Sequence, residues 1–359
     1  MNEAGRRLPR KGRGTLSNAT NRFEPYAREA IDDGWGSLDE EPPPLRTTVQ
    51  VDTTRTIIAR NQSPDIPFDQ SINPYRGCEH GCVYCYARPT HAYLGLSPGQ
   101  DFESRLFAKP DAAALLRAEL AKPSYCCKVM ALGTNTDPYQ PIERTWQVTR
   151  SVLEVLAACA HPVGIVTKSA LILRDRDILA PMAHLRLAKA FLSVTTLDRG
   201  LARRMEPRAA TPERRLETIR GLAEAGIPTG VMVAPVIPGL NDHEMEAVLE
   251  AAKAAGATTA GYVLIRLPLE IKDLFREWLE AHAPDRAKRV ISLIRDCHDG
   301  KDYVAEFRRR QVGTGPIAVL IAQRFKLAVT RLGLDRDAQR LDTTKFRRPS
   351  LETRQLSLL

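Results

Sequence analysis

From about residue 70 onward, short apolar runs rich in β-branched residues alternate with longer stretches whose apolar positions recur every three or four residues. The short runs are typical of buried strands and the longer stretches of amphipathic helices. The predicted strands are residues 71–75, 127–133, 162–168, 189–197, 229–236 and 260–267. Helices are predicted for residues 111–122, 142–160, 174–187 and 269–298.

Two further helices have ends that the sequence marks. Thr211 followed by Pro212 is predicted to be an N-cap with proline in the first helical position, and Gly226 to end that helix. Asn241 is predicted to cap the next helix, with Glu244 three residues later as in a capping box. These ends place loops between each strand and the helix beside it.

Six strand–helix units in succession predict an α/β fold with a parallel sheet, and their number favours an open, partial (β/α)6 barrel over a complete one. In such folds the loops at the carboxyl ends of the strands carry the chemistry. We expect a flexible N-terminal extension over residues 1–45, basic at first and then acidic and proline-rich. The barrel is predicted for residues 46–270, and a helical, basic C-terminal extension for residues 271–359.

Composition narrows the class of protein. With 43% hydrophobic and 26% charged residues, the chain is not disordered throughout. Its seven cysteines are too few for a disulfide scaffold in 359 residues, and clustered thiols indicate a metal site in a reducing compartment. No apolar run approaches the ~18 residues of a membrane span, and no secretory signal is evident. We therefore predict a cytoplasmic protein with no membrane partner.

The strongest chemical signal is the segment NPYRGCEHGCVYCYARPTH, directly after the first predicted strand. Cys78, Cys82 and Cys85 have the spacing C-x3-C-x2-C, and Gly77 and Gly81 allow the backbone to turn tightly around them. Thiolates are soft ligands that favour zinc or iron–sulfur clusters. The other four cysteines are scattered and are interpreted as structural.

Three kinds of metal site are compatible with this loop. A structural zinc ion would take His80 or His91 as a fourth ligand, although such sites often use C-x2-C pairs. A ferredoxin-type cluster would need a fourth cysteine, and the motif contains three. A 4Fe–4S cluster with one iron open to a small molecule needs only these three, and the spacing favours it.

Further motifs come after this loop in order: Tyr-Cys-Tyr at residues 84–86, GTNTDPYQPIE at 133–143, TKS at 167–169 and FLSVTT at 191–196. Together with the cysteine spacing, they resemble the radical S-adenosylmethionine (radical SAM) superfamily, in its spore-photoproduct-lyase-like branch, also called DNA repair photolyase-like. The resemblance covers about residues 70–270.

The resemblance implies the cofactors. Cys78, Cys82 and Cys85 would hold three irons of a 4Fe–4S cluster, and SAM would chelate the fourth iron. An electron from a flavodoxin- or ferredoxin-like donor then breaks SAM into methionine and a 5′-deoxyadenosyl radical, which abstracts hydrogen from the substrate. Such a cofactor carries the difficult chemistry, and the protein binds and orients it.

The resemblance also implies residues that contact SAM, and each has a structural alternative. The alternatives are a turn at the end of a strand, a solvated lysine, buried hydroxyls bonded to backbone, and a solvated helix face. The predicted SAM contacts are Thr136, Asp137, Lys168, Ser193, Thr195, Glu206, Arg208 and Arg215.

Tyr84 and Tyr86 are the candidate catalytic residues, as a tyrosine relay for hydrogen or radical transfer or, alternatively, as rings that shield the cluster. Thr134 is a departure from the branch, because spore photoproduct lyase has a cysteine there that returns a hydrogen atom to the product radical. A threonine O–H bond is too strong for that role. The expected reaction therefore differs from photoproduct reversal.

The substrate is predicted to be a polyanion, with nucleic acid as the preferred class, because the net charge is +9. The basic residues concentrate near the two ends of the chain: Arg6, Arg7, Arg10, Lys11, Arg13, Arg308, Arg309, Arg310, Lys345, Arg347 and Arg348. The alternative function is a nucleic-acid-binding or repair-complex protein whose iron–sulfur or zinc site is structural and performs no SAM chemistry.

Overall fold

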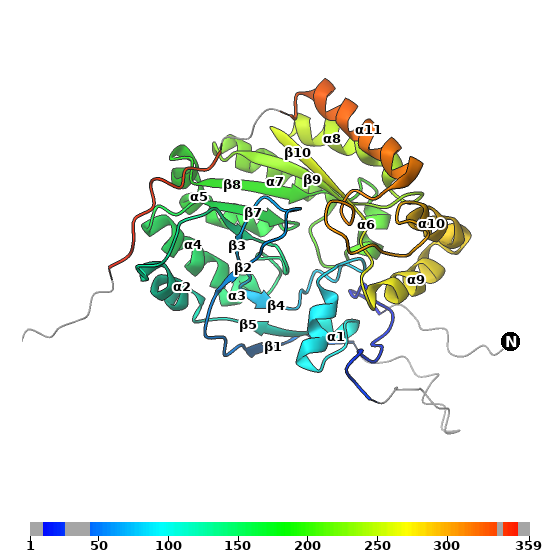
Figure 1. Cartoon of the computed structure of the whole chain (residues 1–359), viewed down its shortest axis with the longest axis horizontal. Helices are drawn as coiled ribbons and strands as arrows, with labels where there is room; N and C mark the ends of the chain where they lie inside the picture. The colour runs from blue at the N-terminus through cyan, green and yellow to red at the C-terminus, as the bar shows by residue number, and fades with distance from the viewer. Residues whose placement is uncertain (1–9, 26–43, 336–339, 351–359) are drawn as a thin grey trace, which may run out of the picture.

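The main element of the computed structural model is a seven-stranded sheet in the order β10-β9-β8-β7-β6-β3-β2 (Figure 1). The structure describes residues 10–25, 44–335 and 340–350. Its strands are β2 (Ile58–Arg60), β3 (Gln70–Ile72), β6 (Met130–Leu132), β7 (Val163–Thr167), β8 (Ala188–Ser193), β9 (Thr229–Val236) and β10 (Thr259–Leu264). Neighbouring strands from β3 to β10 are parallel, and β2 is antiparallel to β3. The predicted α/β fold with six parallel strands and a partial barrel is confirmed.

Helices connect the parallel strands and cover the sheet (Figure 1). They are α2 (Ala112–Ala121), α4 (Val148–Ala158), α5 (Arg176–His184), α6 (Arg199–Met205), α7 (Pro212–Glu224) and α8 (Met245–Ala254). The helical C-terminal segment is also confirmed, as α9 (Ile271–His282), α10 (Pro284–Asp296) and α11 (Gly315–Leu332), the last of which packs on α8. Within the described part of the chain, no helix has both the length and the apolar composition needed to cross a membrane.

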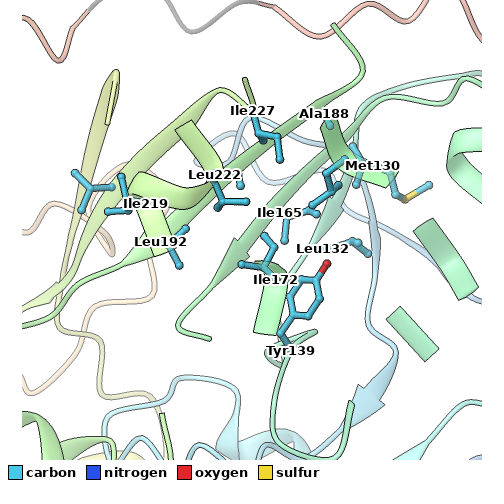
Figure 2. Close-up of a cluster of buried hydrophobic side chains, with 14 of the residues drawn as sticks. Met130, Leu132, Tyr139, Ile165, Ile172, Ala188, Leu192, Ile219, Leu222 and Ile227 are labelled. Atoms are coloured by element: carbon cyan, nitrogen blue, oxygen red, sulfur yellow. The ribbon is translucent and has the colours of Figure 1, made fainter. Parts of the chain in front are cut away.

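Apolar side chains from the sheet and from α7 form the core between them. Figure 2 shows Leu132, Ile165 and Leu192 of the strands near Ile219 and Leu222 of α7. All five are fully buried. Each buried aliphatic side chain contributes ~1.5–3 kcal/mol to the stability of the fold. This layer therefore fixes the sheet from which the loops of the site extend.

A second, three-stranded sheet is formed by strands on both sides of the cysteine loop in the sequence, and it shows that the first predicted strand is wrong in part. Residues 71–75 do not form one strand, because β3 ends at Ile72 and β4 (Tyr75–Arg76) pairs with β5 (Arg105–Ala108). Asn73 and Pro74 separate them, since proline lacks the N–H that a ladder needs. β1 (Thr48–Val51) completes this sheet in the order β1-β5-β4.

Two predicted helices are shorter than expected. The helix predicted for residues 142–160 is broken by Gln147, which has a φ of +48° and separates α3 (Glu143–Trp146) from α4. The Glu143 carboxylate accepts a hydrogen bond of 2.9 Å from the Thr149 N–H, so it stabilises the start of α4. The other, predicted for residues 174–187, is α5, which comes after the 3₁₀ helix η2 (Ala170–Asp175).

The two predicted helix caps have different outcomes. Thr211 is confirmed as the cap of α7, because its hydroxyl accepts from the Arg214 N–H. The capping box at Asn241 is wrong. The Asn241 amide instead donates to the Thr195 and Pro235 carbonyls and accepts from the Ile237 N–H. Asn241 therefore ties the end of β9 to the end of β8.

The predicted flexible arm is wrong for the part of it that the structure describes. Arg13, Thr15 and Ser17 are buried, and the chain around them packs on α1 (Gln100–Ser104) (Figure 1). Arg13 donates to the Glu103 carbonyl at 2.7 Å. The polar, basic composition of this segment indicated a solvated arm, because composition does not show that its partners lie about 90 residues later in the chain. Arg6, Arg7 and most of the acidic, proline-rich segment lie outside the described residues.

Candidate active site

The cysteine loop runs from β4 to the 3₁₀ helix η1 (Arg88–Leu94) at the carboxyl edge of the main sheet. Cys78 and Cys82 are buried and Cys85 is partly buried. The Cys78 N–H donates to the Phe102 carbonyl at 2.9 Å, which fixes one side of the loop. Gly81 has a φ of +69°, and a Cβ there would lie 2.7 Å from a Glu103 carboxylate oxygen, so the turn requires glycine.

The donor set fits a metal cluster better than a single ion. Burial raises the pKa of the Cys78 and Cys82 thiols, so their thiolates need a cation beside them. Among the residues that the structure describes, no three His, Cys, Asp or Glu side chains converge as one zinc ion would require. The ligands of a cluster bind different irons and need not converge on one point.

Each of the two histidines considered as zinc ligands has one ring nitrogen engaged within the protein. His80 Nδ1 lies 3.4 Å from a carboxylate oxygen of Asp137, and His91 Nε2 lies 2.9 Å from the Arg105 carbonyl oxygen. Burial lowers the pKa of His91 to about 4, so its imidazole is neutral near pH 7.

Arg88 supports the loop from behind and was missed by sequence reasoning. Its guanidinium is fully buried and donates to the Cys82 carbonyl at 2.8 Å, to the Pro98 and Gly99 carbonyls, and to Glu103 at 2.6 Å. An arginine in a polar segment is usually solvated, so no signal in the sequence distinguished it. Arg88 holds the backbone of the loop in place.

The N-terminal segment covers the same side. Glu103 accepts hydrogen bonds from the Gly14 N–H at 2.8 Å and from the Thr15 N–H at 3.0 Å. A Cβ at Gly14 would lie 1.7 Å from the Gly81 carbonyl oxygen, so only glycine allows this approach. Segments about 65 residues apart in the sequence are thereby packed backbone to backbone.

Asp137 joins the loop to the ends of two strands. One carboxylate oxygen accepts from the Thr167 hydroxyl at 2.7 Å, and the other accepts from the Lys168 N–H at 2.8 Å and faces His80. Burial alone would raise the pKa of Asp137, but His80 and these hydrogen bonds lower it to about 2. The predicted contact is thus an ionised carboxylate held within the protein. Its neighbour Thr136 is buried, and its hydroxyl donates to the Tyr75 carbonyl at 3.1 Å.

A closed buried network contains five other predicted residues. Tyr84 and Thr195 both donate to a Glu206 carboxylate oxygen, Thr195 at 2.7 Å. Arg215 is buried, forms an ion pair with Glu206, and donates to the Ser193 carbonyl at 3.0 Å and to the Ala210 carbonyl at 2.8 Å. The structure brings these residues together, but it uses Arg215 and Glu206 to neutralise each other. Their predicted role as direct SAM ligands gains no support from this arrangement.

Arg208 is exposed, apart from that network. It forms an ion pair of 2.9 Å with Glu79, and its N–H donates to the His80 carbonyl at 3.3 Å. Glu79 also accepts from the Thr47 hydroxyl at 2.7 Å. Arg208 therefore fastens the cysteine loop from outside.

Lys168 stands at the end of β7 with its ammonium 5.8 Å from the centre of the Tyr84 ring. Among the described residues, no carboxylate pairs with it. Its positive charge lowers the pKa of Cys82, against the larger raising effect of burial. Lys168 is therefore a cation beside the thiols that is open to an anionic ligand.

Tyr86 comes directly after Cys85 and has 44% of its surface exposed. Its hydroxyl donates to the Thr134 carbonyl, and the Arg266 guanidinium lies 4.7 Å from the centre of its ring. Arg266 was not predicted, because it comes after the last strand without a recognisable motif. Tyr86 spans from the end of β6 to the end of β10.

The predicted basic ends are in part neutralised. Arg309 pairs with Asp299 and Glu306, and Arg310 pairs with Asp65 at 2.7 Å. Lys345 donates to the Leu185 carbonyl, and Arg348 to the Pro123 carbonyl. A count of charges overstated how many of these cations face solvent freely.

Comparison with known proteins gives both a family and a fold. The family model described as the radical SAM superfamily matches residues 72–252. Uncharacterized protein Rv2578c of Mycobacterium tuberculosis is 38% identical over 66% of this chain and 71% of its own length. Uncharacterized protein MJ0683 of Methanocaldococcus jannaschii is 27% identical over 60% and 76%, respectively. Spore photoproduct lyase complexed with dinucleoside spore photoproduct aligns with a TM-score of 0.54 at 16% identity, covering 79% of this chain and 78% of that one. At that identity the likeness establishes a shared fold.

Proposed function

Because the chain belongs to the radical SAM superfamily and is a radical SAM enzyme, we propose that it is of the spore-photoproduct-lyase-like branch and that Cys78, Cys82 and Cys85 ligate three irons of a 4Fe–4S cluster. The observation that carries this proposal is the pair of buried thiols whose charge needs compensation, in a loop whose backbone Arg88 holds from behind. The cluster and SAM, when bound, supply a carbon-centred radical that abstracts hydrogen. The protein supplies the ligands, the orientation and the exclusion of water.

Lys168 binds the carboxylate of SAM in this proposal. Of the two predicted cations near the thiols, Arg215 is paired with Glu206, and Lys168 has no acidic partner among the described residues. Asp137 is a positioning residue that accepts the Lys168 N–H and so fixes the end of β7. Thr136, Ser193 and Thr195 lie at the same edge, and Glu206, Arg208 and Arg215 hold the surrounding loops.

The two tyrosines divide their proposed roles. Tyr84 is buried and donates to Glu206, so it shields the cluster and shapes the wall of the site. Tyr86 is half exposed and is our candidate for contact with the substrate and for radical relay. Thr134 lies where photoproduct reversal needs a cysteine. We therefore propose that the reaction begins with hydrogen abstraction but that no residue at this position returns a hydrogen atom to the product radical.

The proposed substrate is a nucleic acid, supported by the net charge of +9 and by the fold shared with an enzyme whose structure holds a dinucleoside. The electron donor is proposed to be a flavodoxin- or ferredoxin-like protein, since radical SAM enzymes need a reductant. The competing function is a nucleic-acid-binding protein with a structural cluster.

Anaerobic reconstitution separates the two. We expect the reconstituted protein to bind iron and sulfide and, with SAM and dithionite, to release 5′-deoxyadenosine. Cys82→Ala should abolish both. A protein that holds the cluster and binds DNA in a salt-sensitive way, yet leaves SAM intact, would contradict the proposal and support the structural role.

A further inference from the structure

Arg266 occupies a position beside Tyr86 that no role assigned above explains. It lies two residues after β10, at the edge where Thr134 lies just after β6 and Lys168 just after β7. Because the carboxyl ends of parallel strands meet at one edge, these three residues lie along the same edge of the sheet. In the strand order, β10 is three strands from β7.

The guanidinium of Arg266 is held in place but is not neutralised. Its Cζ lies over the Tyr86 ring, 4.7 Å from the ring centre, and one terminal nitrogen lies 3.5 Å from the Tyr303 hydroxyl. Its Nε is enclosed and has no hydrogen-bond partner. Among the described residues, no carboxylate pairs with Arg266.

Other arginines with enclosed head groups are treated differently by this fold. Arg88 pairs with Glu103 and Arg215 with Glu206, each with further bonds to backbone carbonyls. A buried N–H without a partner costs about 1–3 kcal/mol, and more when the group is charged. The cost at Arg266 is met when a ligand supplies the missing acceptor.

The geometry of the donor that lacks an acceptor indicates the class of ligand. The Nε and a terminal nitrogen of a guanidinium form a fork that matches two oxygens of a phosphate or a carboxylate. Here the fork is beside a half-exposed aromatic ring, and a ring next to a cation is the combination with which proteins bind single-stranded nucleic acid. This pairing favours phosphate over carboxylate.

We propose that Arg266 is a specificity-determining residue that binds a phosphate of the substrate, next to the base or sugar that contacts Tyr86. The inference deepens the proposed function and rests on it for the identity of the reaction. Stacking on Tyr86 leaves the guanidinium pre-oriented, so little side-chain freedom is lost when the phosphate binds.

The test measures binding and SAM cleavage separately in the cluster-containing protein. Calorimetric titrations use the dinucleoside monophosphate TpT, neutral thymidine and acetate, in the presence of SAM. The variants are Arg266→Gln, Arg266→Lys and, as a matched control, Arg331→Gln, which removes an exposed arginine of α11 paired with Glu250. Release of 5′-deoxyadenosine without substrate is measured in each.

We expect Arg266→Gln to weaken TpT binding at least about tenfold, because one charge-assisted, bidentate contact is lost. Arg266→Lys should be intermediate, and Arg331→Gln should match the wild type. SAM binding should be retained in all three, and thymidine binding and 5′-deoxyadenosine release should be unchanged in Arg331→Gln.

Equal TpT affinity in Arg266→Gln and wild type would overturn the inference. So would acetate that binds as tightly as TpT, or loss of SAM binding in Arg266→Gln, which would move Arg266 to the SAM site. If the wild type releases no 5′-deoxyadenosine, the proposed function fails, while a selective loss of TpT binding still supports the phosphate site.

Discussion

The two sides of the cysteine loop handle charge in opposite ways. Behind the loop, Arg88 and Glu103 are both fully buried, and together they bond to the backbone of the cysteine loop, of the residues just before α1 and of the N-terminal segment. In front of it, Lys168 and Arg266 are cations with no acidic partner among the described residues. The contrast indicates that the charged groups whose hydrogen bonds are all made within the protein hold the site in place, and that the charged groups without an acidic partner bind ligands. An unpaired charge near the interior is otherwise costly in free energy.

The cluster itself should respond most strongly to substitution. Cys82→Ala should remove all cluster iron, whereas Cys127→Ala, a partly buried cysteine outside the loop, should retain it. Iron quantitation and visible absorbance of the reconstituted proteins measure both. Retention in Cys82→Ala with loss in Cys127→Ala would place the metal elsewhere.

Loss of the buried ion pair behind the cysteine loop should lower the stability of the fold. Arg88→Met leaves Glu103 as a buried, unpaired charge, and we expect the free energy of unfolding to fall by about 3–5 kcal/mol. Arg331→Met breaks the exposed pair with Glu250 and should cost less than about 1 kcal/mol. Urea denaturation monitored by circular dichroism compares them. Equal losses would mean that the buried pair is no more important than a surface one.

His91 is an exception behind the loop, because its Nδ1 is buried without a hydrogen-bond partner. Its folded pKa, lowered to about 4 by burial, is below the unfolded value of about 6.5. The folded state therefore keeps its full stability above pH 6.5 and loses it as the pH falls toward 4. At pH 5 this group should cost about 2 kcal/mol relative to pH 7.5.

The measurement is urea denaturation at pH 7.5 and at pH 5. His91→Gln should reduce the difference in stability between the two pH values, and His243→Gln, which changes an exposed histidine, should leave it as in the wild type. An undiminished difference in His91→Gln would show that His91 does not titrate as its burial requires.

A smaller change in free energy is expected at the front of the loop. Lys168→Met should weaken SAM binding about tenfold, the value of one charge-assisted contact, and should leave cluster iron unchanged. Lys128→Met, a change of an exposed lysine paired with Asp69, should affect neither. The measurement is the equilibrium binding of SAM to each cluster-containing variant. Unchanged affinity in Lys168→Met would transfer the SAM carboxylate to another residue.

The sequence predicted those parts of the molecule that depend on neighbouring residues. Strand periodicity located all six parallel strands, the spacing of Cys78, Cys82 and Cys85 located the loop, and Thr211 capped α7 as expected. These signals are local, because a strand, a ligand loop and a cap each depend on residues a few positions apart.

The features that could not be predicted depend on pairing across the chain. Asn241 has the sequence of a cap, yet it bonds to the ends of β8 and β9. Arg215 was predicted to contact SAM and Arg266 had no predicted role. Only the fold shows that Arg215 pairs with a buried glutamate and that Arg266 pairs with no carboxylate among the described residues. These partners lie 6 to 46 residues away at no fixed spacing, so they leave no periodic trace in the sequence.

The close approach of Gly14 to the Gly81 carbonyl shows that the folded domain begins earlier in the chain than the sequence motif does. By sequence motif, the recognisable part is residues 72–252. A fragment cut at those limits would lose Gly14 and Thr15, and Glu103 would lose the N–H donors that they provide. The unit of evolutionary descent is thus smaller than the unit that the fold requires, and truncations for expression should retain the chain from Arg13 onward.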